Sequence, residues 1–482
     1  MKLSKLIRHV KTVSVTGDTG KEIRSVVIDN RQAEPGSLFI AIRGTAVDGH
    51  RFIPAAIAAG CIAVVCEEIP EQAGEQIAWI RVADARIALA AVAAEFYGNP
   101  SHDLKLIGVT GTNGKTTIAT LLYKLYRGLG YKAGLLSTVE VRIEDKVIPA
   151  THTTPDPLQL NRLLREMADA GCGYCFMEVS SHAAAQHRIG ALLFRGGIFT
   201  NLTHDHLDYH PTFRNYLEAK KSFFDQLGPE AFALTNADDK NGMVMLQNCR
   251  AMKESYSIRS LAGFRARIIE EHIDGTGMEL EGQTFWTRLP GRFNVSNVLA
   301  VYGAAVMEGQ DREQVKAVLS GLGSVRGRFE TLQGSSGVTA VVDYAHTPDA
   351  VMNVLETISG LKKEGSAIIT VVGAGGNRDK TKRPKMAAIA ATYSQKVILT
   401  SDNPRDEDPE AILQDMLTGI TPEQQNRVLA VVNREEAIKT ACLLARPGDV
   451  ILVAGKGHET YQEVKGVKNH FDDREVVLKY LK

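Results

Sequence analysis

The sequence predicts an α/β protein with three domains, each built on a mostly parallel sheet. Short runs of β-branched and other apolar residues alternate with helical patterns along nearly the whole chain, which is typical of strand–helix–strand units. The expected strands cover residues 26–28, 62–65, 106–109, 174–179, 197–200, 367–372, 396–400 and 450–453. The expected helices cover residues 85–96, 157–170, 213–227, 295–307, 348–361 and 434–444. A chain of 482 residues also has room for about three domains.

Two breaks in these patterns predict the domain boundaries. Residues 97–101 read YGNPS, a turn-rich segment directly before an apolar strand pattern. Residues 326–328 read RGR and precede a new strand pattern at 338–342. We therefore expect domains over residues 1–98, 99–327 and 328–482.

Composition excludes several classes of protein. Lys and Arg together number 56, as do Asp and Glu, and this balance argues against a nucleic-acid binder driven by bulk charge. The six cysteines are expected to be reduced, because the one C-x-x-C pair, at 172–175, has no second pair to complete a zinc site. No apolar run approaches the ~20 residues of a membrane helix, and the first 13 residues lack the apolar core of a secretory signal. We expect a cytoplasmic protein without nucleic-acid or membrane partners.

The most informative segment follows the expected strand at 106–109. It reads TGTNGKTT from Thr110 to Thr117 and leads into a helical pattern. Glycines let backbone N–H groups approach an anion, and a helix N-terminus adds partial positive charge. A lysine here reaches terminal phosphates and a threonine hydroxyl can bind Mg²⁺. Val109 stands where the common loop has its first glycine, so this loop is two residues shorter. The expected phosphate-binding residues are Gly111, Thr112, Asn113, Gly114, Lys115, Thr116 and Thr117.

Two acidic or histidine-rich segments follow strands in the same part of the chain. Glu178 ends the expected strand at 174–179, where a carboxylate either holds Mg²⁺ against phosphates or caps a neighbouring element. Residues 200–210 read TNLTHDHLDYH. The H-x-H-x-D spacing from His204 fits a metallohydrolase, and the same groups also fit a second cation site beside a bound nucleotide. The phosphate loop and Glu178 favour the second hypothesis.

Three polar loops follow strands near the C-terminus. Residues 373–379 read GAGGNRD and begin like a dinucleotide-binding motif, but Arg378 replaces its third glycine and suits a substrate carboxylate better. Residues 401–405 read SDNPR, and residues 454–459 read AGKGHE. Charges of both signs on these loops suit a zwitterionic ligand.

Six motifs in a fixed order, GTNGKTT, EVSSH, TNLTHDHLDYH, EAK, GRFNVSN and DYAHTP, resemble those of the Mur ligases, the ATP-dependent amino-acid-adding enzymes of peptidoglycan precursor synthesis. The resemblance spans nearly the whole chain, and DNPR at 402–405 is similar to members that add meso-diaminopimelate. It implies a uridine-nucleotide-binding N-terminal domain, a central P-loop-type ATPase domain, a Rossmann-like C-terminal domain and a monomer. The alternatives are an L-lysine-adding member, a folylpolyglutamate-synthase-like ligase, and a protein that binds ATP without turnover.

The resemblance also implies a reaction. ATP phosphorylates the D-glutamate γ-carboxylate of UDP-MurNAc-L-Ala-D-Glu, and the amine of meso-diaminopimelate attacks the acyl phosphate. Two Mg²⁺ ions would be held by Thr116 and Glu178, and by Glu178, His206 and Lys220. Lys220 would carry a CO₂-derived carbamate, whereas its segment alone predicts only an amphipathic helix with solvated lysines. Together with Lys115, the residues Glu178, His206 and Lys220 form the implied catalytic set.

Single residues are implied to bind each substrate. Those for ATP, besides the loop, are Asn294, Asn297, Arg328 and Asp343. Those for the uridine dipeptide substrate are Asn30 (where serine is usual), Thr153, Thr154, Ser180, Gln186 and Arg188, with the uridine itself near residues 27–31, Gly44 and 48–50. Those for diaminopimelate are Arg378, Asp402, Asn403, Pro404, Arg405, Gly455 and Glu459.

Overall fold

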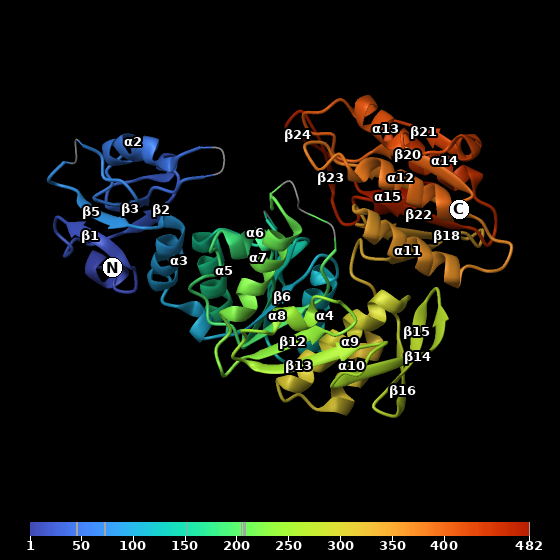
Figure 1. Ribbon diagram of the computed structural model, residues 1–482, viewed down its shortest axis with the longest axis horizontal. Helices are drawn as coiled ribbons and strands as arrows, with labels where there is room; N and C mark the ends of the chain where they lie inside the picture. The colour runs from blue at the N-terminus through green and yellow to red at the C-terminus, as the bar shows by residue number, and fades with distance from the viewer. Residues whose placement is uncertain (45–46, 72–73, 151, 204, 206–208, 482) are drawn as a thin grey trace.

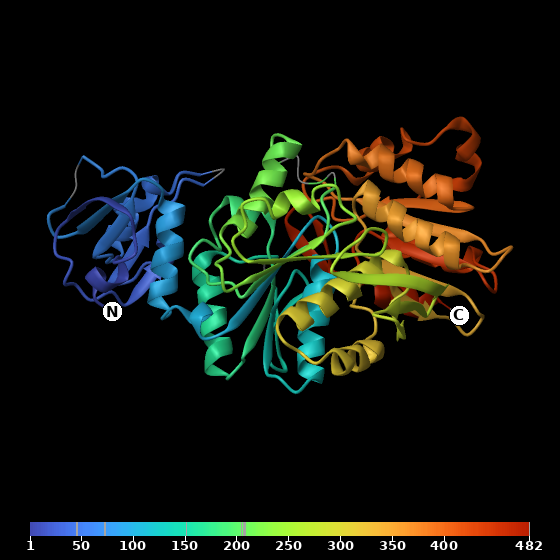
Figure 2. The same cartoon turned by 60° about the horizontal axis from the view of Figure 1, so that its bottom comes forward.

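The computed structural model describes residues 1–44, 47–71, 74–150, 152–203, 205 and 209–481. Three large sheets and one two-stranded sheet follow one another along the described chain, and the predicted α/β class is confirmed. The central lobe lies between the other two in both views, with the N-terminus and C-terminus in opposite outer lobes (Figures 1 and 2). The expected boundaries at 98/99 and 327/328 each fall between two sheets, and the domain limits themselves stay a prediction. Within the described residues, every helix is too short or too polar to cross a membrane.

The N-terminal sheet has the order β1-β5-β4-β3-β2, parallel except for β1. Helix α3 begins after Asp84, whose carboxylate accepts hydrogen bonds from the N–H groups of Arg86 and Ile87 and so caps the helix. It then packs against α5 of the central domain (Figure 1). The elements are α1 (Leu3–Leu6), β1 (Thr12–Thr16), β2 (Ser25–Val27), β3 (Ser37–Ile40), α2 (Ile53–Ala58), β4 (Ala63–Cys66), β5 (Ala78–Val82) and α3 (Ala85–Phe96).

The central sheet has eleven strands in the order β16-β15-β14-β13-β12-β11-β6-β10-β7-β8-β9. Its middle is parallel and its two ends are antiparallel hairpins. The strands are β6 (Lys105–Thr110), β7 (Ala133–Leu136), β8 (Glu140–Ile143), β9 (Lys146–Pro149), β10 (Tyr174–Glu178), β11 (Gly196–Phe199), β12 (Phe232–Asn236), β13 (Met252–Ser257), β14 (Phe264–His272), β15 (Gly275–Leu280) and β16 (Gln283–Thr287). The helices are α4 (Lys115–Gly128), α5 (Pro157–Asp169), α6 (Ser181–Ala185), α7 (Phe213–Asp225), α8 (Gly242–Met245), α9 (Arg292–Met307) and α10 (Arg312–Gly321).

The C-terminal sheet has the order β17-β18-β22-β19-β20-β21, parallel except for β17. Its strands are buried on both faces, as in Val371–Val372 and Ile398–Leu399, which explains their continuous apolar runs. The strands of this sheet are β17 (Glu330–Gln333), β18 (Thr339–Asp343), β19 (Ile368–Ala374), β20 (Lys396–Ser401), β21 (Val428–Ala430) and β22 (Val450–Ala454). The strands β23 (Tyr461–Val464) and β24 (Val467–His470) form a separate antiparallel pair. The helices are α11 (Pro348–Leu361), α12 (Lys382–Tyr393), α13 (Pro409–Leu417), α14 (Arg434–Leu444) and α15 (Asp473–Tyr480).

Candidate active site

The carboxyl ends of four neighbouring strands, β10, β6, β11 and β12, meet at one edge of the central sheet. A cavity of about 990 Å³ opens there, between this edge and the C-terminal domain. The segment 112–117, Glu178 and Lys220 line it from the central domain, and Arg328 and Arg378 line it from the C-terminal domain. Ligands of open α/β sheets bind at such strand ends.

The loop between β6 and α4 requires its glycines. Gly111 has φ +148°, and a Cβ there would lie 1.8 Å from Thr200 Oγ1. Gly114 has φ +88°, and a Cβ there would lie 2.7 Å from Asn297 Oδ1. Helix α4 begins directly after the loop, at Lys115, so the first N–H groups of the helix have no intrahelical acceptors. The loop therefore has the local structure of an anion site.

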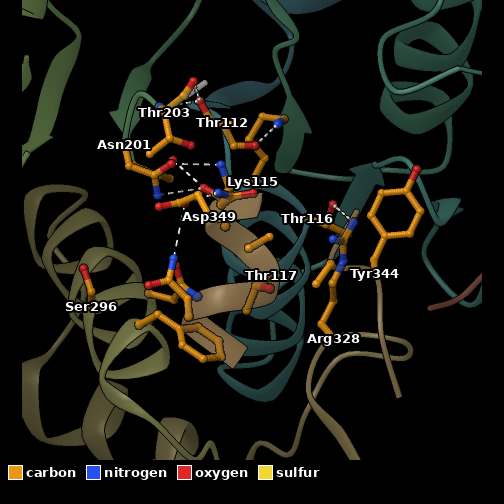
Figure 3. A pocket seen from close by; sticks show the side chains of 18 of the residues that line it. Thr112, Lys115, Thr116, Thr117, Asn201, Thr203, Ser296, Arg328, Tyr344 and Asp349 are labelled. Carbon is orange, nitrogen blue, oxygen red and sulfur yellow. Dashed lines mark hydrogen bonds between the residues drawn. The ribbon is translucent and has the colours of Figure 1, made fainter. Parts of the chain in front are cut away.

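Asn201 and Lys115 fix the shape of this loop. The N–H of Thr112 donates to the Asn201 carbonyl at 2.8 Å, and the N–H of Asn113 donates to Asn201 Oδ1 at 2.9 Å. Lys115 Nζ donates to the carbonyl of Thr112 at 2.8 Å (Figure 3) and to that of Gly111 at 3.0 Å. Burial lowers the pKa of Lys115. Asn201 lies within a motif that the sequence singled out, but its structural role was not predicted.

Glu178 combines burial with an unsatisfied oxygen. Its Oε1 accepts the N–H of Thr138 at 2.6 Å. Its Oε2 is buried and has no hydrogen-bond partner among the described residues. A buried carboxylate oxygen without a partner is costly unless a ligand completes it, so this oxygen fits a cation.

Lys220 is 1% exposed, which overturns the hypothesis of a solvated lysine on an amphipathic helix. Its Nζ donates to the Gly111 carbonyl at 2.7 Å and lies 4.7 Å from the centre of the Tyr216 ring. Burial, with the charge of Lys115 in addition, holds the pKa of Lys220 well below its usual value. Burial at this position thus disfavours the charged form of the amine.

His206 lies outside the described residues, as do His204 and Asp208 of the H-x-H-x-D pattern. Within the part of the chain that the structure describes, no three His, Cys, Asp or Glu side chains cluster as a metal site. Cation binding by Glu178 and Lys220 thus stays a prediction, supported by the unpartnered Glu178 oxygen and by the burial of Lys220.

Of the residues expected to bind the nucleotide, Asn297 and Arg328 line the cavity and Asn294 does not. Asn297 lines the cavity, and its Nδ2 donates to Asn294 Oδ1 at 3.2 Å. Asn294 is buried behind it and donates to the Pro290 carbonyl at 2.9 Å. Arg328 Nη2 donates to Thr116 Oγ1 at 2.9 Å, with its guanidinium 4.4 Å from the Tyr344 ring centre (Figure 3).

Asp343 also lines the cavity, at the end of β18. Its carboxylate accepts the N–H groups of Phe329 at 2.6 Å and Ala345 at 2.7 Å, and burial raises its pKa. The sequence did not single out Asp349, which accepts a hydrogen bond from Asn113 Nδ2 at 3.0 Å. The Asn113–Asp349 and Thr116–Arg328 bonds both join the phosphate loop to the C-terminal domain.

Four of the residues expected to bind the dipeptide substrate are connected by hydrogen bonds, namely Thr154, Ser180, Gln186 and Arg188. Thr154 Oγ1 donates to the Glu178 carbonyl at 2.8 Å and accepts the N–H of Ser180 at 3.2 Å. Arg188 donates to the Thr154 carbonyl at 2.7 Å and to Gln186 Oε1 at 2.7 Å. Burial lowers the pKa of Arg188. Thr153, Thr154, Ser180 and Arg188 line the cavity, whereas Asn30 lies in the N-terminal domain, outside the lining.

Three C-terminal loops bring together the residues expected to bind diaminopimelate. Asn403 Nδ2 donates to Glu459 Oε2 at 2.7 Å, and Arg405 Nη1 donates to the Gly376 carbonyl at 2.7 Å. Gly455 has φ +118°, and a Cβ there would lie 2.9 Å from Asp402 Oδ2. Pro404 lies against a different glycine: its carbonyl oxygen would be 1.9 Å from a Cβ at Gly376. Arg378, exposed on the neighbouring loop, lines the large cavity instead.

Known proteins resemble this chain over its whole length. Family models match in chain order: Mur ligase family, catalytic domain, at residues 22–97; Mur ligase middle domain at 109–305; and Mur ligase, glutamate ligase domain, at 327–457. A Bacteroides thetaiotaomicron protein called UDP-N-acetylmuramoyl-L-alanyl-D-glutamate--2,6-diaminopimelate ligase is 56% identical over 99% of both chains. A Chlorobaculum tepidum protein of the same name is 44% identical over 94% of this chain and 91% of its own.

Solved structures agree with the sequence relatives. A structure described as UDP-N-acetylmuramoyl-L-alanyl-D-glutamate--2,6-diaminopimelate ligase is 31% identical, covers 100% of this chain and 98% of its own, and gives a TM-score of 0.70. A Mycobacterium tuberculosis folylpolyglutamate synthase complexed with ADP is 18% identical over 77% of this chain and 92% of its own, with a TM-score of 0.63. At that identity, the second likeness concerns the fold alone.

Proposed function

The chain belongs to the Mur ligase family, and on that premise we propose that it adds meso-diaminopimelate to the D-glutamate γ-carboxylate of UDP-MurNAc-L-Ala-D-Glu at the expense of ATP. The relatives that are 54–56% identical over 98–100% of the chain are all named for this activity. The observation that carries the proposal is one cavity that contains the phosphate loop, Glu178, Lys220 and two arginines of the C-terminal domain. The product belongs to peptidoglycan precursor synthesis, and hence to cell-wall biogenesis, cell shape and cell division.

The reaction has two steps. A γ-carboxylate oxygen bonds to the γ-phosphorus of ATP as the β–γ bridging P–O bond breaks, giving ADP and an acyl phosphate. The diaminopimelate amine then attacks the acyl carbon, the C–O bond to phosphate breaks, and the nitrogen loses a proton. The difficulty is electrostatic, because a carboxylate must approach a triphosphate. Lys115 and Arg328 line the cavity, and we propose that their positive charges reduce this repulsion.

We further propose that two Mg²⁺ ions act here, supplying positive charge between the two anionic reactants. Thr116 and Glu178 would hold the first ion, and Glu178, His206 and Lys220 the second. The partnerless Glu178 Oε2 supports the acidic part of this ligand set. The burial of the Lys220 amine, which lowers its pKa, supports a carbamate, since only an uncharged amine attacks CO₂. His206 enters this proposal through its sequence motif.

The substrate contacts are also proposals. Asn30 and the loops around Gly44 and 48–50 would bind the uridine, and Thr153, Thr154, Ser180, Gln186 and Arg188 the peptide side. Asn294, Asn297, Arg328 and Asp343 would serve the nucleotide. Arg328 donates to the Thr116 hydroxyl in this structure, so this bond would have to break before Thr116 could bind Mg²⁺. We propose that the C-terminal domain moves when ATP binds.

For the amino acid, the site has charges of both signs. Arg378 and Arg405 would bind the distal carboxylate of diaminopimelate and Glu459 its distal ammonium, with Asp402, Asn403, Pro404 and Gly455 shaping the loops. L-lysine lacks the second carboxylate, which would leave an arginine unpaired and disfavour lysine. We propose in addition that the protein is a cytoplasmic monomer whose partners are small molecules, without nucleic acid or membrane.

An amino-acid panel tests the proposal. Purified protein is incubated with ATP, Mg²⁺, UDP-MurNAc-L-Ala-D-Glu and one amino acid, and ADP formation is followed. We expect turnover with meso-diaminopimelate and at least about a hundredfold lower kcat/KM with L-lysine. Preference for L-lysine would overturn the amino-acid assignment, and turnover with a folate and glutamate would favour the folylpolyglutamate alternative.

A further inference from the structure

Lys456, a fully buried lysine, lies among the loops that follow β20 and β22, and the proposed function assigns it no role. Its Nζ donates to Glu459 Oε2 at 3.0 Å and to Asn403 Oδ1 at 3.1 Å. The same ammonium lies 3.8 Å from Asp402 Oδ1. One cation therefore contacts three side chains that are proposed to serve the amino-acid substrate.

The charges around Lys456 balance one another. Burying an ammonium is costly unless anionic partners compensate it, and Asp402 and Glu459 supply that compensation. The reverse also holds, because two carboxylates brought together without a cation would repel. Burial and the Asp402 carboxylate raise the pKa of Glu459, and Lys456 acts in the opposite direction. Lys456 thus favours an ionised Glu459.

Hydrogen bonds from Lys456 also link the loop at 401–405 to the loop at 454–459. Asn403 uses both ends of its amide, donating to Glu459 Oε2 at 2.7 Å and accepting the N–H of Glu463 at 2.9 Å. The bonds from Asn403 and from Lys456 both end on Oε2 of Glu459, which leaves Oε1 as the oxygen that can meet a ligand. Rotation of Glu459 would break both bonds at once.

We propose that Lys456 is a positioning residue for the amino-acid substrate: its ammonium fixes Asn403 and Glu459 so that the Glu459 carboxylate can bind the distal ammonium of a diamino acid. This inference rests on the proposed function and adds a specificity determinant to it. Lys456 acts through Glu459 and Asn403, so its effect belongs to binding of the amino acid and not to phosphoryl transfer.

Steady-state kinetics of the full-length enzyme test this role with Lys456→Met, which keeps the length of the side chain and removes its charge. We expect the KM for meso-diaminopimelate to rise about 10–100-fold, with the KM values for ATP and the uridine substrate within about twofold. Lys456→Arg restores the cation and should give an intermediate KM for the amino acid. Lys439→Met is the matched control, because Lys439 is a surface lysine paired with Glu436 on α14.

The outcomes separate this inference from the proposed function. If the unaltered enzyme turns over diaminopimelate and Lys456→Met leaves its KM unchanged, the positioning role is wrong and the function stands. A parallel rise in all three KM values would indicate a merely structural role and would also overturn the inference. If Lys456→Met does not fold, Lys456→Arg decides alone, with a selective rise of at least about threefold expected and no rise as the refutation. Failure of the unaltered enzyme with diaminopimelate would instead refute the proposed function.

Discussion

The ATP side and the amino-acid side of the molecule balance their charges differently. On the ATP side, Lys115 and Lys220 donate to neutral backbone carbonyls, and Glu178 keeps a buried oxygen without a partner among the described residues. On the amino-acid side, Lys456 meets Glu459 and Asp402. The ATP side thus keeps a buried carboxylate oxygen for a ligand to satisfy, whereas the amino-acid side pairs its buried cation with carboxylates of its own.

A second buried ion pair lies at the base of the amino-acid loops, and its charges also compensate each other within the protein. Arg434 and Asp473 are both fully buried and joined by two bonds of 2.7 Å. Arg434 also donates to the carbonyls of Ser401 at 3.3 Å and Ala454 at 3.0 Å, the last residues of β20 and β22. The comparison indicates that the ATP side leaves polar groups for ions and substrates to complete, whereas the charges of the amino-acid side are compensated within the protein. Changes on the first should therefore affect turnover, and changes on the second should affect stability and amino-acid affinity.

The largest effect should come from Lys220→Ala. If Lys220 carries a carbamate, its loss removes an anionic ligand from the ATP side, and kcat should fall by about 10³-fold. Added short carboxylates, such as formate or acetate, should restore part of the rate, measured as phosphate release. Lys221→Ala is the matched control, because Lys221 is the next residue on α7 and pairs with Asp225 at 2.6 Å. Near-normal activity of Lys220→Ala without rescue would contradict the carbamate.

Arg434→Met should have the next largest effect, and it should act on stability. Removing one partner of a buried ion pair leaves Asp473 uncompensated, which costs about 3–5 kcal/mol of the free energy of unfolding. Chemical denaturation followed by fluorescence measures this loss. Arg446→Met is the control, since Arg446 is exposed near the end of α14. A loss below about 1 kcal/mol would show that the pair does not behave as a desolvated one.

Among the kinetic constants, Glu459→Gln should affect the KM for the amino acid alone. The amide keeps the shape of the side chain and loses the charge that would meet the distal ammonium, so the KM for meso-diaminopimelate should rise about tenfold or more. The KM for ATP should not change, because Glu459 lies on the amino-acid side and does not line the cavity that contains the phosphate loop. Glu475→Gln, on the exposed start of α15, is the control. A KM change shared equally by ATP would mean that the two regions are not independent.

The elements with long, regular patterns were predicted well from the sequence. The expected helices at 85–96, 348–361 and 434–444 are confirmed as α3, α11 and α14 with the same limits. The antiparallel hairpins β7–β9 and β14–β16 were not predicted, because strands such as Lys146–Pro149 are short and exposed and carry little apolar signal. Their pairing is decided by contacts with distant strands, which local sequence does not encode.

At the site, sequence patterns predicted which side chains take part better than they predicted the burial and contacts of those side chains. The motifs identified the phosphate loop, Glu178 and the three C-terminal loops. The segment around Lys220 predicted a solvated lysine, because an amphipathic pattern does not reveal that a loop from another strand covers the helix. Lys456 was overlooked for a related reason: a lysine between two glycines has the local signal of an exposed turn, and only the fold places Asp402 and Asn403 around it.

The smallest effect should come from Glu407→Gln, at the edge of the amino-acid side. Glu407 accepts bonds from Arg383 of α12 at 2.9 and 3.0 Å and from the N–H of Asn377, and so joins the 373–379 loop to the segment that follows residues 401–405. The Arg383 guanidinium lowers the pKa of Glu407 to about 2. Because the folded pKa lies below the unfolded value, the stabilisation is present above about pH 4.5 and is lost as pH falls toward about 2.

At pH 7 the free energy of unfolding of Glu407→Gln should be about 1–3 kcal/mol lower than that of the unaltered protein. This difference should shrink steadily between pH 4.5 and 2. Glu364→Gln, on an exposed turn, should show no such convergence. A difference that is independent of pH over this range would mean that Glu407 joins the loops by shape and not by charge.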